Sequence, residues 1–213
     1  MTSPRIIDHM CPTHVWACRI RWPIAGDWQA LCGQCASCRQ RSSGLSTGQV
    51  LPDFTPGQLD QVHAIHEAGH AVAALARNVP LASVEIWRDG EDGKRPDGGY
   101  TDFGDTQWVG SVSAIDRFTA LWAGQEATDR WLTEMGLGTN ANRLDVRFLA
   151  WHDARLFEET VSGECLNVPS DWGVIEARDL VAAEWKQVTA LAAELVARRW
   201  LSGDEVRALL SIA

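Results

Sequence analysis

The sequence of 213 residues predicts a mainly α-helical domain with one small β-hairpin or sheet, preceded by a small cysteine-rich module. Apolar residues recur at helical spacing behind good capping residues in several stretches after residue 55. One stretch, 82–87, alternates small or apolar residues with polar ones, as strands do. Five of the six cysteines lie in the first 38 residues. We therefore divide the chain into a module at 1–43, a linker at 44–55 and a main domain at 56–213.

The first helix of the main domain is defined at both ends. Thr55 can cap its start, and Pro56 suits the first helical position. The helical pattern ends near Ala76, and Pro80 follows. One apolar stripe is predicted on this helix, formed by Ile65, Ala68, Val72 and Leu75.

The remaining elements follow in order. Residues 82–87 and 99–103 predict two strands joined by a glycine-rich turn. The next helices are predicted at 113–134, where Ser113 and Asp116 form a capping pair, and at 143–157. Ser170 opens one long helix, and Ser202 with Glu205 forms a capping box for a short closing helix.

The first helix carries the pentad His66-Glu67-Ala68-Gly69-His70. Two histidines four residues apart lie on one face of a helix, with Cβ atoms ~5–6 Å apart, so both imidazoles can reach one Zn²⁺. Glu67 is placed to act as the base for a metal-bound water. The pentad therefore predicts a catalytic zinc with His66 and His70 as ligands and Glu67 as the catalytic residue. The alternative is two buried histidines bonded to backbone carbonyls, which leaves their spacing unexplained.

A catalytic zinc usually has a third protein ligand, with water in the fourth position. Glu85 and Glu91 lie on the predicted hairpin, which is a poor place for this ligand. The other candidates lie on later helices, and spacing alone does not choose among Glu126, Asp129 and Asp145.

Several strings of the chain resemble the peptidase domain of the FtsH family, which are ATP-dependent zinc metallopeptidases. The similarity extends through most of residues 56–211 and is carried first by the motif string Ala64–Val72. The other similar strings are Val84–Ile86 with Gly98–Thr101, Leu121–Ala127 and Leu201–Val206.

This resemblance implies a zincin-like helical metallopeptidase domain. In that family the third zinc ligand is an aspartate at the start of a helix, after a loop with glycine and asparagine. Here the stretch from Gly138 to Asn142 precedes Asp145, so the resemblance implies Asp145, although this loop is longer than the family's usual pattern. The family's ATPase module and membrane segments have no counterpart in the sequence. We therefore expect an ATP-independent zinc metalloendopeptidase that acts on peptides, disordered segments or one partner's exposed loop.

The expected mechanism uses a zinc ion held by His66, His70 and Asp145. The metal would lower the pKa of its water to near ~7, and Glu67 would take the proton and later deliver it to the leaving amine. The strand around Val84–Trp87 would either pair with an extended substrate, as edge strands do, or simply cover the motif helix.

The N-terminal module contains two pairs that resemble metal knuckles, Cys11 with His14 and Cys32 with Cys35. Cys38 and Cys18 are further thiols in this stretch. Four such ligands suit a tetrahedral structural zinc, which would fold a segment too small for its own core. Redox-active thiols and chance clustering in a disordered arm are the alternatives.

The composition limits the possible partners. The net charge of −9 argues against broad nucleic-acid binding, although residues 1–43 carry a net +3. For the module we rank recognition of a protein partner first and nucleic acid second. No apolar run approaches the ~20 residues that span a bilayer, so we expect a cytoplasmic protein without membrane segments.

Two further hypotheses compete with the peptidase. One is a catalytically silent regulatory or binding protein that keeps the fold and recognises a partner through the cysteine-rich module. The other is an enzyme of the same architecture that hydrolyses a non-peptide amide. The sequence does not determine the substrate, the cleavage preference or the oligomeric state.

Overall fold

The computed structural model describes residues 5–11, 14–22, 54–88, 98–104, 112–139, 142–143, 146, 153 and 170–211. The chain divides into two compact units. One comprises Met1–Asp53 with Leu137–Asp145, and the other comprises Phe54–Gly136 with Val146–Ala213. The predicted linker, 44–55, lies almost wholly outside the described residues.

The first unit contains an antiparallel pair of strands, β1 (Arg5–Cys11) and β2 (His14–Trp22). Cys11 and His14 are backbone partners, and the register shifts between His9 and Cys11. Cys32, Cys35 and Cys38 lie outside the described residues. The second, structural metal site therefore stays a prediction.

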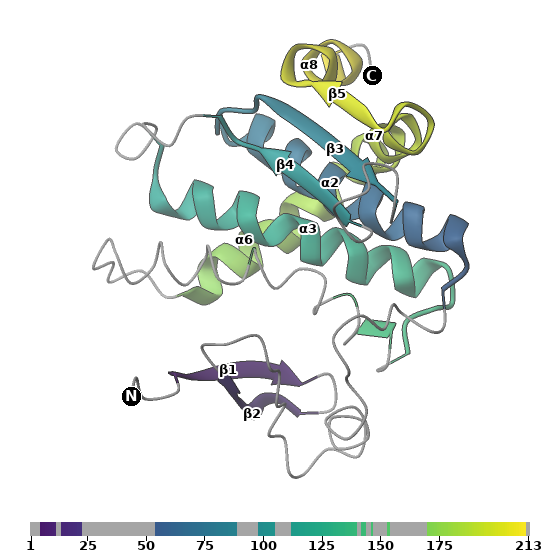
Figure 1. Cartoon of the computed structure of the whole chain (residues 1–213). Helices are drawn as coiled ribbons and strands as arrows, with labels where there is room; N and C mark the ends of the chain where they lie inside the picture. The colour runs from purple at the N-terminus through teal and green to yellow at the C-terminus, as the bar shows by residue number, and fades with distance from the viewer. Residues whose placement is uncertain are drawn as a thin grey trace. The chain divides into compact units, whose positions relative to one another are not determined.

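The second unit is mainly helical with a small antiparallel sheet (Figure 1), as predicted for the main domain. Its central element is helix α2 (Pro56–Ala76), which begins with the predicted Thr55 cap and Pro56. The predicted single apolar stripe is too narrow, because nearly every residue from Leu59 to Ala74 is buried. Helices α3 and α7 and strands β3 and β4 all pack on α2, so its polar residues must find partners inside the fold.

The sheet has three strands in the order β4-β3-β5, formed by β3 (Ser83–Trp87), β4 (Gly98–Asp102) and β5 (Trp200–Ser202). The hairpin of β3 and β4 is confirmed, whereas the third strand was not predicted. Because β5 pairs with Ser83–Glu85, β3 is the central strand. The expectation that β3 receives a substrate as an edge strand is therefore wrong. Within the described chain, the outer edge next to α2 belongs to β4.

Helix α3 (Ala114–Glu134) begins where predicted, and Ser113 accepts a hydrogen bond from the Asp116 amide. The predicted long helix from Ser170 is wrong, because two helices occur, α6 (Ser170–Ala183) and α7 (Trp185–Arg198). The break lets α6 pack on α3 while α7 packs on α2 and the sheet. Trp185 holds the new helix start, since its Nε1 donates to Glu134 at 3.0 Å.

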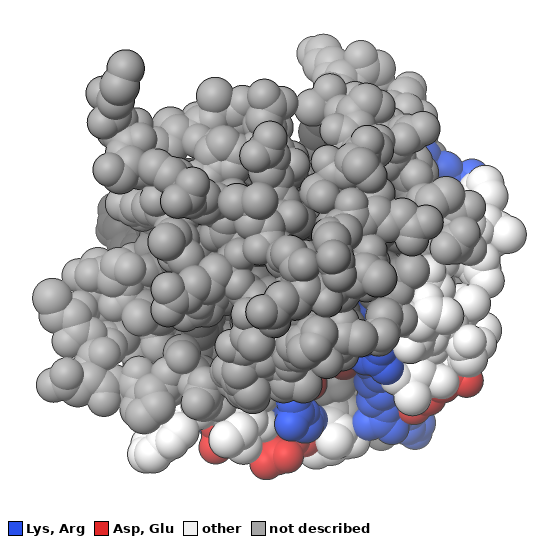
Figure 2. Space-filling model, turned by 90° about the horizontal axis from the view of Figure 1, so that it is seen from below, with Lys and Arg blue, Asp and Glu red and all other residues white. Residues whose placement is uncertain are grey.

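Helix α8 (Gly203–Ser211) closes the chain behind the predicted capping box. The Ser202 amide donates to Glu205 at 2.9 Å, and the Glu205 amide donates to the Ser202 hydroxyl at 3.3 Å. Among the described helices, none has the length and apolar character needed to cross a bilayer. Both basic and acidic residues occur on the described part of the face drawn in Figure 2.

Candidate metal centre

The two motif histidines are oriented by hydrogen bonds at the Nδ1 atoms of their rings. Nδ1 of His70 lies 2.8 Å from the Ala120 carbonyl oxygen, which can only accept, so Nδ1 carries the proton. Nδ1 of His66 lies 3.2 Å from the Thr128 hydroxyl. That hydroxyl donates its one proton to the Gly124 carbonyl at 2.8 Å, so it accepts from His66. In their neutral forms both rings therefore present an unprotonated Nε2.

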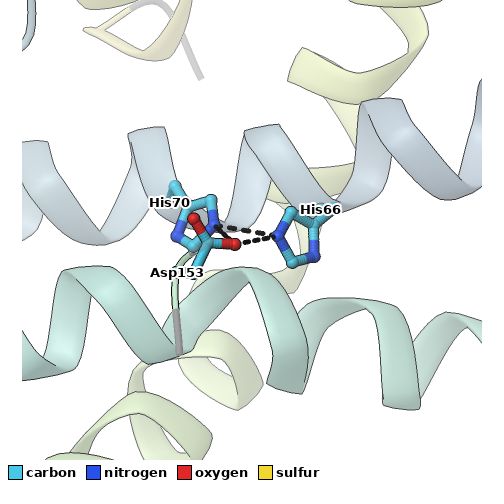
Figure 3. A group of neighbouring side chains, drawn as sticks. All are labelled: His66, His70 and Asp153. Atoms are coloured by element: carbon cyan, nitrogen blue, oxygen red, sulfur yellow. Dashed lines mark hydrogen bonds and ion pairs between the residues drawn. The ribbon is translucent and has the colours of Figure 1, made fainter. Parts of the chain in front are cut away.

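These two Nε2 atoms converge with a carboxylate oxygen of Asp153, as Figure 3 shows. The Nε2 atoms lie 3.0 Å apart, and Asp153 Oδ2 lies 2.8 Å from His66 Nε2 and 3.3 Å from His70 Nε2. All three atoms are hydrogen-bond acceptors when the rings are neutral. One proton cannot satisfy all three close contacts, whereas a cation between them can. The group can therefore hold a metal ion.

The spacing of the three atoms is close to that of the ligand atoms around a small tetrahedral ion. Zinc bonds of ~2.0–2.1 Å to nitrogen and oxygen place neighbouring ligand atoms ~3.3 Å apart. The contact of 3.3 Å already has this value, and the contacts of 2.8 and 3.0 Å need only a few tenths of an ångström of expansion. The Nδ1–H bonds that fix the ring orientation are the outer contacts usual for histidine ligands of metals.

The charges of the group are compatible with a bound cation. Burial alone would lower the pKa of His70, but Asp153 and Glu67 and the Ala120 carbonyl outweigh it and raise the pKa to about 9. Burial alone would raise the pKa of Asp153, but the two imidazoles hold that pKa well below its ordinary value. Without a metal, the group thus retains a proton on His70 at neutral pH beside an ionised carboxylate.

Glu67 is buried beside the group, with 6% of its surface exposed. Burial raises the pKa of its carboxyl group, while the charges of His66 and His70 oppose that rise. The Thr101 hydroxyl of β4 donates to Glu67 Oε2 at 2.7 Å. Glu67 is therefore a fixed carboxylate of increased basicity, a property that suits a proton acceptor.

Two glycines make room for this arrangement between α2 and α3. A Cβ atom on Gly69 would lie 2.6 Å from the Ala123 carbonyl oxygen, so the helices approach more closely there than any side chain would allow. A Cβ atom on Gly124 would overlap the imidazole of His70. The His70 ring thus occupies the space that a larger residue at 124 would fill.

The structure brings together the predicted His66 and His70 with Glu67 nearby, and it adds Asp153. Asp145, the predicted third ligand, lies outside the described residues, as does most of the predicted helix 143–157. Of the other candidates, Glu126 is engaged elsewhere, by Trp122 Nε1 at 3.1 Å and Arg178 at 3.2 Å.

Asp153 was missed because no local spacing points to it. It lies 83 residues beyond His70 in the chain, and only the folded structure brings the two together. The one signal in the sequence is its place in a predicted helix that follows the α3 region. No model of a protein family and no curated protein matches the chain.

Proposed function

We propose that this protein is an ATP-independent zinc metallopeptidase with a zincin-like, FtsH-like domain, and that Asp153 rather than Asp145 is the third zinc ligand. The observation that carries the proposal is the convergence of two imidazole Nε2 atoms and one carboxylate oxygen within 3.3 Å, each turned toward the same point. Three nitrogen and oxygen ligands with a fourth position for water are the usual set of a catalytic zinc.

The chemistry follows from the neighbours of this group. A zinc ion bound there would polarise a water molecule and the carbonyl of a scissile peptide. Glu67 would accept the proton released from that water and transfer it to the nitrogen of the leaving amine. Its buried position supports this role, because burial raises the pKa of the carboxyl group toward the range that suits proton transfer.

We further propose that the substrate is an extended polypeptide that lies along the free edge of β4. Two observations support this position. In the described chain β4 pairs with β3 alone, and Gly99 and Thr101 of the same strand contact Glu67. An extended chain bound to this edge by backbone hydrogen bonds would run beside the proposed base.

The test is cleavage of an unfolded protein, such as casein, by the zinc-loaded chain. Glu67→Gln should lower the cleavage rate by ~10²–10⁴-fold, the usual contribution of a general base, while bound zinc remains. A chelator should stop cleavage by the unmodified protein, and zinc should restore it. Glu126→Gln is the matched control, because Glu126 pairs with Arg178 and does not belong to the group, and it should keep its activity.

A different outcome would favour the regulatory hypothesis. If the protein binds zinc at one equivalent but neither it nor Glu126→Gln cleaves any unfolded protein, the peptidase proposal fails. If Glu67→Gln cleaves as fast as the unmodified protein, then cleavage occurs without the proposed base, and the assignment of Glu67 fails.

A further inference from the structure

We propose that Thr101 is a positioning residue that fixes the direction of the Glu67 carboxylate. The effect of Thr101 on catalysis rests on the proposed function, whereas its contact with Glu67 does not depend on that function. Strand β4 would then both lie beside the substrate and orient the carboxylate of Glu67.

The hydrogen bonds of Thr101 support this role. Its hydroxyl lies 2.7 Å from Glu67 Oε2 and 3.2 Å from the Glu67 carbonyl oxygen, so its single proton serves the nearer carboxylate. Thr101 is 5% exposed and Glu67 is 6% exposed. A hydrogen bond between buried groups, one of them charged, is stronger than one in water and holds the side chain in one orientation.

Gly99 restricts the same carboxylate from a second direction. A Cβ atom at this position would lie 2.7 Å from Glu67 Oε1, so the carboxylate lies directly against the backbone of β4. Gly99 and Thr101 are two residues apart on the strand and therefore share the face that covers α2. The carboxylate is thus held between a hydroxyl donor and a backbone wall.

The contact with Thr101 bears on which carboxylate oxygen of Glu67 accepts the proton of the water. Oε2 already accepts the Thr101 hydroxyl proton and is the weaker base of the two oxygens, so we assign the proton transfer to Oε1. The O–H bond of the water would break as a new O–H bond forms at Oε1, while Thr101 continues to donate to Oε2. Without the Thr101 hydroxyl, the carboxylate could rotate, and the accepting oxygen would no longer be held in place.

The test compares Thr101→Val, which keeps the shape and removes the donor, with Thr101→Ser, which keeps the donor. Thr119→Val is the matched control, because Thr119 is a buried threonine whose hydroxyl donates to the Ile115 carbonyl within its own helix. We expect Thr101→Val to lower kcat by ~10–100-fold, the size of effect that misplaced catalytic groups produce, with KM and zinc content unchanged. Thr101→Ser and Thr119→Val should retain kcat within about threefold.

Crystal structures of Thr101→Val and of the unmodified protein give a readout that needs no turnover. A carboxylate of Glu67 turned away from its original position in Thr101→Val supports the proposal. An unmoved carboxylate, or a kcat equal to that of Thr119→Val, overturns it. If the unmodified protein does not cleave, the peptidase proposal fails, and the Glu67 orientation still decides the role of Thr101. If Thr101→Val does not fold, Thr101→Ala takes its place in the same comparison.

Discussion

Helix α2 carries two clusters of buried polar groups that differ in their balance of hydrogen-bond donors and acceptors. Near its start, the Asp60 carboxylate binds the guanidinium groups of Arg88 and Arg199, with contacts of 2.9 and 3.0 Å. Two to three turns later, or ~9–15 Å along the axis, His66 and His70 meet Asp153. The first cluster contains acceptors and donors, whereas the second contains three acceptors when its histidines are neutral.

The difference separates a structural cluster from a binding site. Burial raises the pKa of Asp60, but the hydrogen bonds and charges of Arg88 and Arg199 outweigh it and lower the pKa to about 2. That carboxylate is therefore satisfied by the chain itself and needs no ion. At the second cluster, none of the three side chains is a permanent cation, so its positive charge comes from a proton or a metal. Of the two clusters, the second is therefore the candidate metal centre.

The largest expected effect is on zinc affinity, and one experiment compares a variant from each cluster. His70→Ala should weaken zinc binding by ~10³-fold or more, beyond the ~10–100-fold typical of changes to outer contacts of a metal site. Asp60→Asn should change zinc affinity by less than about threefold, because it lies outside the group. Isothermal titration with zinc measures both. Equal losses in the two variants would show that zinc affinity follows overall stability and not the proposed ligands.

The second effect concerns stability, to which both clusters should contribute in the metal-free protein. Asp60→Asn replaces the buried carboxylate with a neutral amide beside two partly exposed guanidinium groups, so it should lower the free energy of unfolding by about 2 kcal/mol. His70→Ala should also lower it when no zinc is present, because it removes a buried ring and leaves the Asp153 carboxylate without its protonated partner. Urea denaturation at neutral pH gives these values. A stability of Asp60→Asn within about 0.5 kcal/mol of the unmodified protein would contradict the structural role of this cluster.

The third effect is the pH dependence of the Asp60 cluster. Because folding lowers the pKa of Asp60 from 3.8 to about 2, its contribution to stability is complete above about pH 4 and is lost as the pH falls toward 2. The size of this contribution is about 2 kcal/mol, from a pKa shift of nearly two units. The difference in unfolding free energy between the unmodified protein and Asp60→Asn should therefore shrink across this range. A difference in unfolding free energy that does not change with pH would contradict an ionised Asp60 paired with Arg88 and Arg199.

The smallest effect tests the packing that supports the metal group. Gly124→Ala places a methyl group against the His70 ring and should weaken zinc binding by ~10-fold, as changes to outer contacts do. Gly57→Ala is the matched control, because no atom lies within 4 Å of the added Cβ. Titration with zinc compares the two. Unchanged affinity in Gly124→Ala would mean that the His70 ring does not need its present position.

The sequence predicted those parts of the fold that depend on neighbouring residues. The Thr55 cap, the Ser113–Asp116 pair and the Ser202–Glu205 box each act within a single turn of helix, and all three occur in the structure. The spacing of His66 and His70 is equally local, since one turn of helix places both rings on the same side.

The remaining features depend on contacts between distant parts of the chain. The break at Glu184 has no proline or glycine to signal it and arises because α6 and α7 pack on different helices. The third strand, Trp200–Ser202, is too short for a periodic pattern. Asp153 has no fixed spacing from the motif, because a third ligand is selected by tertiary structure.

The most direct test of the central claim is the zinc content of two matched variants, Asp153→Asn and Asp145→Asn, purified beside the unmodified protein. Cys32, Cys35 and Cys38 stay unchanged in all three, so any structural zinc in the cysteine-rich module is a constant background. We predict that Asp153→Asn contains one equivalent less zinc than the unmodified protein, while Asp145→Asn contains the same amount. Loss of zinc from Asp145→Asn together with full retention in Asp153→Asn would contradict the assignment of His66, His70 and Asp153 as the metal centre.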